Sequence, residues 1–155
     1  MLFALLKTLH VLGAMLFLGA GLMTAYYKTR ADRSGDLRVI AWCQAEIVRA
    51  DWIFTLPSAF LLPSTGIGLA LLYGAPLTRG WVGLGLLGFA LSGLLWLPAV
   101  HLQLKMKALA EEALRLGAPL PEAFHRANRQ WLLLGLPAFA IALGTVWIMV
   151  SKWSP

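Results

Sequence analysis

Histidine residues within or beside long apolar stretches are the side chains of this sequence best suited to chemistry. His10 lies inside the first long apolar stretch, His101 near the end of the third, and His125 just before the fourth. An ionisable group inside a membrane-spanning segment is energetically costly, which makes it a candidate functional residue. A neutral imidazole can carry a proton, ligate a metal ion or bind haem iron.

The residues that share a helical face with His10 are small or aromatic. Gly13, Phe17 and Gly21 follow it by three, seven and eleven residues, a spacing that places them on one face of a helix. The imidazole would ligate the iron of a haem, the glycines would leave room for the macrocycle, and the phenylalanine would pack on it. The pattern predicts a haem b site with His10 as axial ligand. The alternative is a histidine that hydrogen-bonds across helices.

A second axial ligand must come from the same half of the membrane as His10. By helix rise, His10 lies about 12 Å into its span and His101 lies roughly 18–20 Å deeper, so these two residues cannot hold one haem. Met149, near the outer end of the last span, is at the right level, and a thioether is a known haem ligand. We therefore predict Met149 as the second ligand, with a five-coordinate iron or a packing role for Met149 as alternatives.

A second group of polar residues belongs to the opposite, inner side of the membrane. Asp51, His101 and His125 are its main members, and Glu122 and Arg126 lie close to His125 in the sequence. Together they could surround a haem propionate, a quinone headgroup or a proton path. The alternative is a solvated charged rim.

The composition places these residues in a membrane protein. Of the 155 residues, 59% are hydrophobic and 13% are charged, whereas soluble domains carry about 45–50% and about 25%. A water-soluble globular enzyme and a disordered chain are therefore excluded, and little length remains for a separate catalytic domain. The single cysteine, Cys43, permits no internal disulfide.

Four apolar stretches are long enough to cross a bilayer, and they must do so as helices. They predict an all-α, integral membrane four-helix antiparallel bundle, forming one domain over residues 1–155, with spans at 2–27, 52–73, 81–104 and 131–150. Ten of the thirteen basic residues lie in the two longer loops between them. The positive-inside rule places these loops in the cytoplasm and both termini outside, as in a bacterial inner membrane. The net charge of +6 is thus explained by basic residues in cytoplasmic loops and does not predict a nucleic-acid partner.

Helix signals continue into both basic loops. Ser34-Gly35-Asp36 offers a helix cap, and apolar residues recur after it at helical spacing, so a short amphipathic helix is expected to lead into the second span. The third span is expected to continue past the membrane as far as Gly117, where two nearby prolines reset the chain.

Several motifs together resemble one family. They are Leu9-His10-Val11-Leu12, Phe17-Leu18-Gly19-Ala20-Gly21, Arg33-Ser34-Gly35-Asp36, Ala50-Asp51-Trp52-Ile53-Phe54-Thr55-Leu56-Pro57, Thr65-Gly66, Trp96-Leu97-Pro98, Leu102-Gln103, and Met149-Val150 with Lys152. In order and spacing they resemble the DUF2269 family of predicted bacterial integral membrane proteins over essentially the whole chain. More distantly, the first span is similar to that of CopD-like and HemJ-like four-helix membrane proteins. In the HemJ type an early histidine is implicated in b-type haem binding, and the resemblance maps that role onto His10.

The sequence therefore predicts a membrane protein that holds haem b and passes electrons to or from a quinone or a periplasmic redox partner protein. It would act as a membrane oxidoreductase or as an electron-transfer component. Two alternatives stay open. One is a haem-free accessory or assembly subunit that packs its glycine faces against a larger complex. The other is a CopD-like metal-handling protein. Whether the chain forms a homo-oligomer in the lipid bilayer is also open.

Overall fold

The computed structural model describes residues 1–153, which are helical almost throughout. The elements in chain order are α1 (Leu2–Ser34), α2 (Leu37–Ala50), the π-helix η1 (Asp51–Thr55), α3 (Leu56–Tyr73), α4 (Gly80–Leu116) and α5 (Glu122–Ser151). Residues 1–153 contain no strand. Four helical stretches are long and apolar enough to cross a membrane, with α2, η1 and α3 counting as one continuous stretch. These features confirm the predicted all-α four-helix membrane bundle.

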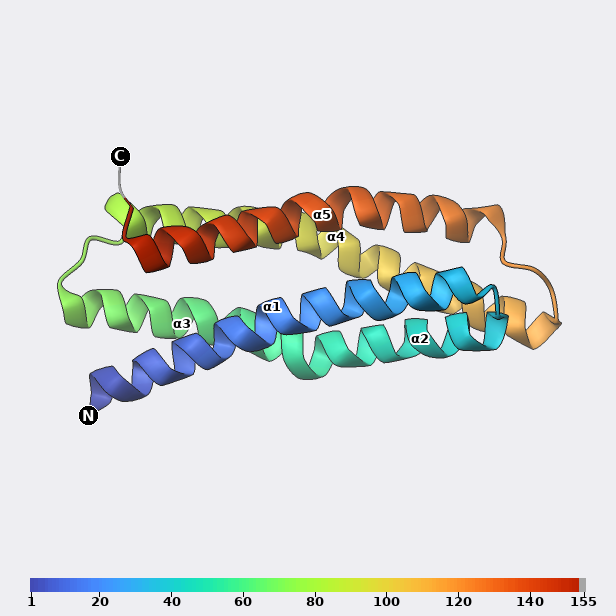
Figure 1. Ribbon diagram of the computed structural model, residues 1–155, viewed down its shortest axis with the longest axis horizontal. Helices are drawn as coiled ribbons and strands as arrows, with labels where there is room; N and C mark the ends of the chain where they lie inside the picture. Colours follow the sequence, from blue (N-terminus) through green and yellow to red (C-terminus); the bar gives the residue numbers. More distant parts are fainter. Residues whose placement is uncertain (154–155) are drawn as a thin grey trace.

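The helices run up and down along one long axis (Figure 1). Met1, the connection from α3 to α4 and the end of α5 lie at one end of the molecule. The turn from α1 to α2 and the connection from α4 to α5 lie at the other end. The chain is therefore an antiparallel bundle in which the N-terminus and the end of α5 lie at the same end, as the sequence predicted.

Three helices are longer than a bilayer requires. α4 has 37 residues, which is about 55 Å of helix against a hydrocarbon core of about 30 Å. α1 continues seven residues beyond the predicted span end at position 27, to Ser34, and α5 begins at Glu122, well before its predicted span. We call the part formed by residues 28–34, 37–50, 105–116 and 122–130 the basic extension. The predicted loops are thus mostly helix.

The best-buried apolar side chains gather at the basic extension. The main cluster comprises Ile40, Ala41, Ala99, Met106, Ala110, Phe124, Ala127 and Trp131. It joins α2, α4 and α5 in one core. This core packs α2 against α4 and α5 at the basic extension.

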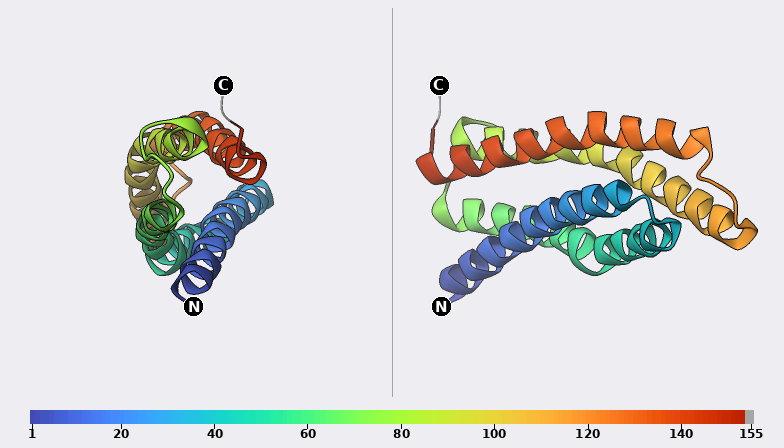
Figure 2. Two further views of the ribbon diagram at one scale, coloured as in Figure 1. Left: turned by 90° about the vertical axis from the view of Figure 1, so that its left-hand side faces the viewer. Right: turned by 45° about the vertical axis from the view of Figure 1, so that its right-hand side comes forward.

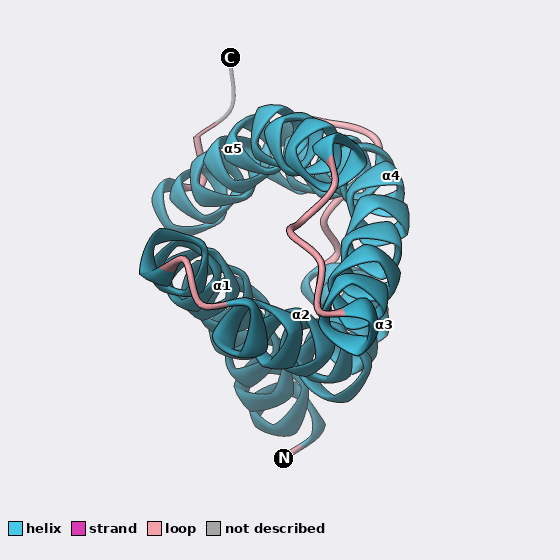
Figure 3. Cartoon of the chain, turned by 90° about the vertical axis from the view of Figure 1, so that its right-hand side faces the viewer, coloured by secondary structure: helices cyan, strands magenta, loops and turns pink. Residues whose placement is uncertain are grey.

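The membrane half consists of two helix pairs. α4 packs extensively on α5 and α1 packs on α3, whereas α1 barely meets α5 and α3 has no substantial contact with α4. The left view of Figure 2 and Figure 3 show the pairs end-on, on opposite sides of the axis. Almost none of the apolar windows of α1 and α5 is buried within residues 1–153. Most of this surface is therefore left to lipid or to another molecule.

Local signals place the ends of two helices as predicted. The Asp36 carboxylate accepts a hydrogen bond from the Arg38 amide at 2.8 Å, which caps the first turn of α2. Gly35 adopts φ 67° and Gly117 adopts φ 62°, the left-handed conformation that commonly ends a helix. α2 therefore begins and α4 ends where the sequence predicted, whereas α1 runs past its predicted end at position 27 to Ser34.

The π-helix η1 was not predicted. The Leu56 amide donates to the Asp51 carbonyl, five residues back. Pro57 lacks an amide hydrogen and cannot complete the normal bond to the carbonyl four residues before it. The widened turn buries Asp51 and Thr55. Wide turns of this kind are frequent at functional sites.

Candidate functional site

His10 forms a hydrogen bond across the interface between α1 and α3. Its Nδ1 lies 3.1 Å from the Leu62 carbonyl oxygen and 3.0 Å from the Thr65 hydroxyl. A carbonyl can only accept, so Nδ1 carries the proton. The Thr65 hydroxyl donates its own hydrogen to the Leu61 carbonyl at 2.6 Å and therefore also accepts from His10. Nε2 is left as the basic nitrogen, with no hydrogen-bond partner among residues 1–153.

Small residues let the His10 ring lie against α3. A Cβ at Gly66 would come within 3.0 Å of His10 Cε1, so the ring fills the space over this glycine. A Cβ at Gly13 would lie 3.4 Å from Leu61 Cδ2. These glycines make room for an imidazole and a leucine. The cross-helix hydrogen bond, which was the predicted alternative to a haem-ligand role for His10, is thus present.

Phe17 and Gly21 turn from α3 toward the other helix pair. The Phe17 ring lies 6.0 Å from the Phe89 ring of α4, tilted by 45°. Phe17 also borders an apolar cavity of about 170 Å³, lined otherwise by Ala59, Phe89, Gly93, Trp96 and Leu97. A Cβ at Gly21 would lie 3.9 Å from Phe139 of α5. The predicted face of α1 therefore does point at the other helices, although His10 does not line this cavity.

Met149 lies in the other helix pair. Its side chain fills the notch above Gly85 of α4, and Thr145 does the same above Gly88. His10 has its partners on α3 instead. The structure thus gives His10 and Met149 different neighbours, because each side chain fills the nearest glycine gap of its own helix pair.

The three predicted residues of the inner side are not gathered into one site. Asp51 is buried, and its Oδ1 accepts a hydrogen bond from Thr55 Oγ1 at 2.7 Å. Gln103 of α4 lies beside this carboxylate, yet Oδ2 receives no hydrogen bond of standard geometry. His101 and His125 are exposed, and the His125 ring stands edge-on to Phe124, with centroids 5.8 Å apart. Asp51 therefore faces the interior while both histidines face outward.

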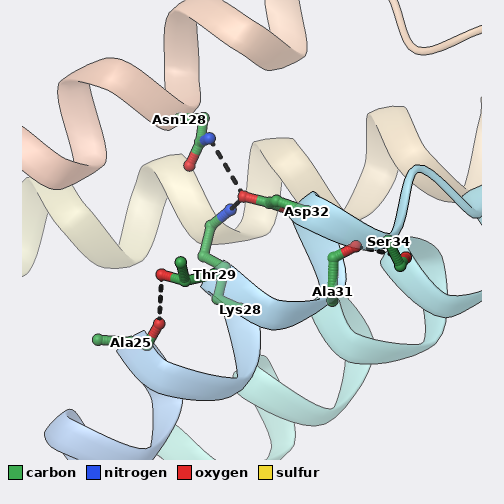
Figure 4. A network of polar contacts seen from close by, with 7 residues as sticks. All are labelled: Ala25, Lys28, Thr29, Ala31, Asp32, Ser34 and Asn128. Atoms are coloured by element: carbon green, nitrogen blue, oxygen red, sulfur yellow. Dashed lines mark hydrogen bonds and ion pairs between the residues drawn. The ribbon is translucent and has the colours of Figure 1, made fainter.

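The basic extension holds a buried ion pair that the sequence did not predict (Figure 4). Lys28 is only 1% exposed, and its Nζ lies 2.7 Å from Asp32 Oδ2. Asn128 of α5 donates to the same oxygen at 3.2 Å. The ammonium also lies 5.5 Å from the ring centroids of both Phe124 and Trp131, within cation–π range. The four-residue spacing of Lys28 and Asp32 was the available signal.

Comparison with known proteins agrees with this architecture. The family model described as "Predicted integral membrane protein (DUF2269)" matches residues 4–153. The chain belongs to this family. No curated protein and no solved structure gives a significant match. Membership shows that the chain is a multi-pass integral membrane protein. Any proposal about its chemistry must rest on the geometry of its residues.

Burial shifts the ionisation of two groups in the basic extension of this DUF2269 protein. Desolvation lowers the pKa of Lys28, while the hydrogen bond from its ammonium to Asp32 acts in the opposite direction. Desolvation also raises the pKa of the Cys43 thiol, against the nearby positive charge of Lys28. The ion pair and the neutral thiol therefore belong to one low-dielectric region.

Three buried oxygens of the DUF2269 chain lack a hydrogen-bond donor among residues 1–153. They are Asp32 Oδ1, Gln44 Oε1 and Asp51 Oδ2. All three are acceptors, so the interior near the basic extension is suited to a proton or to a hydrogen-bond donor. Within the same residues, no three His, Cys, Asp or Glu side chains lie together in the manner of a metal site.

Proposed function

We propose that this DUF2269 protein binds haem b through His10 and transfers electrons within the membrane to or from a quinone or a periplasmic redox partner. The observation that carries the proposal is the pair of acceptors on Nδ1, the Leu62 carbonyl at 3.1 Å and the Thr65 hydroxyl at 3.0 Å. Metal-ligating histidines almost always donate their other ring N–H to such a group, which fixes the tautomer and the ring orientation. The arrangement leaves Nε2 as the coordinating atom.

The donor set fits one axial ligand. His10 offers Nε2, whereas the Met149 side chain is seated against Gly85 of α4. A single histidine is the ligand pattern of five-coordinate haem proteins such as globins. The slight contact between the two helix pairs supports the proposal further, because a flat group between them would displace few packed side chains.

The chain's own residues would orient the ligand and shield the site. A bound haem supplies the one-electron chemistry. Thr65 and the Leu62 carbonyl hold the proton on Nδ1, and Gly66 allows the ring to approach α3. Phe17 and Phe89 provide apolar surface between the helix pairs, on which the macrocycle would pack.

Absorption spectra of the purified protein test the proposal. The full chain is purified in mild detergent from haem-replete cells, and spectra are recorded oxidised and dithionite-reduced. We expect a Soret band that His10→Ala abolishes. His101→Ala and His125→Ala, which change exposed histidines, serve as matched controls and should retain the band. Full haem content in His10→Ala would show that the site is wrong.

The reduced spectrum also tests the number of ligands. Broad high-spin bands would agree with His10 as the single axial ligand. Sharp α and β bands would show a second ligand, and their loss in Met149→Leu would identify it. Thr65→Val keeps the ligand and removes one acceptor from Nδ1. We expect this variant to retain haem more weakly than the wild type, because the imidazole is held less firmly.

A second candidate function follows from the open packing of the membrane half. The apolar windows of α1 and α5 are almost entirely unburied within residues 1–153, and the helix pairs scarcely meet. A haem-free accessory subunit, or a homo-oligomer, would use such surfaces for association. A colourless protein that co-purifies with a stoichiometric membrane partner would support this function. A homogeneous haem-free monomer would contradict it.

A further inference from the structure

An apolar groove lies between α4 and α5, at the junction of the membrane half and the basic extension. It encloses about 420 Å³ and is lined by Pro98, His101, Leu102, Gln130, Leu133 and Leu134. Four of these residues, Pro98, His101, Gln130 and Leu133, are exposed. The groove therefore opens to the surroundings of the protein, while Leu102 and Leu134 in its lining pack against the core. His10 is not among its lining residues.

The two polar residues of the groove lie at the same axial level. His101 is near the end of the apolar segment of α4, and Gln130 directly precedes that of α5. Because α4 and α5 are antiparallel, both side chains mark the end nearest the basic extension. The leucines Leu133 and Leu134 continue the wall toward the membrane interior. The groove is thus polar at its mouth and apolar along its length.

Two unpaired basic residues extend this polar end. Lys105 follows His101 by four residues and Arg126 precedes Gln130 by four, so each continues the same helix face by about one turn. Both are exposed, and neither forms an ion pair among residues 1–153. Because α4 and α5 are antiparallel, both residues lie on the side of the groove that faces the basic extension.

The neighbouring charges are neutralised within the protein. Lys107 pairs with Glu111 at 3.7 Å, and Arg129 pairs with Glu122 at 3.5 Å. Glu122 precedes Arg126 by one helical turn, but its carboxylate forms an ion pair with Arg129. The positive charge at the groove's mouth therefore comes from Lys105 and Arg126.

We propose that this groove binds an anionic phospholipid of the leaflet on the basic side. Its phosphate would lie at Lys105 and Arg126, and an acyl chain would follow Leu133 into the membrane. Basic pockets between transmembrane helices on the cytoplasmic side bind acidic headgroups in this way. A neutral quinone would need no pair of free cations. The proposal is independent of haem binding.

Native mass spectrometry of the full chain tests the proposal, with phosphatidylglycerol and phosphatidylcholine offered in equal amounts. The wild type is expected to retain phosphatidylglycerol selectively. Lys105→Gln with Arg126→Gln should weaken that retention at least roughly tenfold, because each basic residue near the membrane surface favours anionic lipid. Lys107→Gln, on the same helix and paired with Glu111, is the matched control and should behave as the wild type.

A second pair of variants tests the apolar wall while leaving the charges in place. Leu133 is 74% exposed and lines the groove, whereas Leu136 is 69% exposed and lies outside its lining. We expect Leu133→Asn, and not Leu136→Asn, to reduce phosphatidylglycerol retention. Equal retention of both lipids, or undiminished retention in the double charge variant, would overturn the proposal. The proposal would also be overturned if the protein retained a quinone equally well in the wild type and in the double charge variant.

Discussion

The His10 ring occupies the position that a side chain at Gly66 would take, since a Cβ built there lies 3.0 Å from His10 Cε1. The ring cannot move outward without losing its hydrogen bonds to Leu62 and Thr65. Gly66→Ala is therefore expected to overpack the α1–α3 interface, which typically costs about 1–3 kcal/mol. Thermal unfolding in detergent, followed by tryptophan fluorescence, measures the change.

Gly19→Ala is the matched control for this substitution. Gly19 lies on α1, and a Cβ there would meet nothing within 4 Å. Both variants gain the same helix propensity, so their difference isolates the contact with His10. Equal unfolding temperatures for the two variants would show that the ring is not confined by α3.

Removing Lys28 is expected to destabilise the protein severely. Its ammonium is held 2.7 Å from Asp32 and is nearly inaccessible to solvent. Lys28→Ala leaves the partly buried carboxylate with Asn128 as its remaining donor. Breaking a buried ion pair from one side typically costs about 3–5 kcal/mol. Denaturant unfolding of the reconstituted protein would quantify the loss.

An exposed ion pair in the same extension provides the comparison. Arg49 and Glu46 lie 2.6 Å apart, with side chains 65% and 35% exposed. Arg49→Ala should change the free energy of unfolding by only about 0–1 kcal/mol, because water already solvates both groups. If Lys28→Ala is as mild as Arg49→Ala, the Lys28–Asp32 pair is hydrated in solution and is not part of the core.

The sequence was sufficient for the features that depend on local chemistry. Hydropathy located four spans, and Asp36 and Gly117 located the start of α2 and the end of α4, because caps act within a few residues. The inward face of α1 was also predictable from its spacing. Phe17 does meet Phe89 across the bundle.

Features that depend on the facing helix were not predictable from one sequence. Nothing in the sequence near His10 indicates that Gly66 and Thr65 lie opposite it, 56 and 55 residues away. In the sequence Lys28 is one of ten basic residues in the two longer loops, and the positive-inside rule depends on charge and carries no information on burial. The π-helix before Pro57 arises from a missing backbone donor within a continuous apolar run, where hydropathy gives no signal.

Cys43 is expected to be unreactive in the folded protein. It is 4% exposed, and burial raises the pKa of its thiol, so the thiolate that reacts is scarce. Modification by a maleimide at neutral pH should be at least ~10-fold slower in native protein than after unfolding in SDS. As a control, Trp42→Cys in a Cys43→Ala background places the thiol at a neighbouring position that is 66% exposed, and it should react quickly. Similar rates at both positions would contradict the packing of α2.

Reporter fusions test the predicted sidedness. The connection between α4 and α5 adjoins the basic extension, whereas the α3–α4 connection and the end of α5 lie at the opposite end of the bundle (Figure 1). Because lysine and arginine are retained on the cytoplasmic side, a fluorescent protein inserted after Gly117 should fluoresce. Alkaline phosphatase should be active when fused at the C-terminus or inserted at Pro76 in the α3–α4 connection. The reversed pattern would place both termini in the cytoplasm, and it would also move the Lys105–Arg126 groove to the outer leaflet.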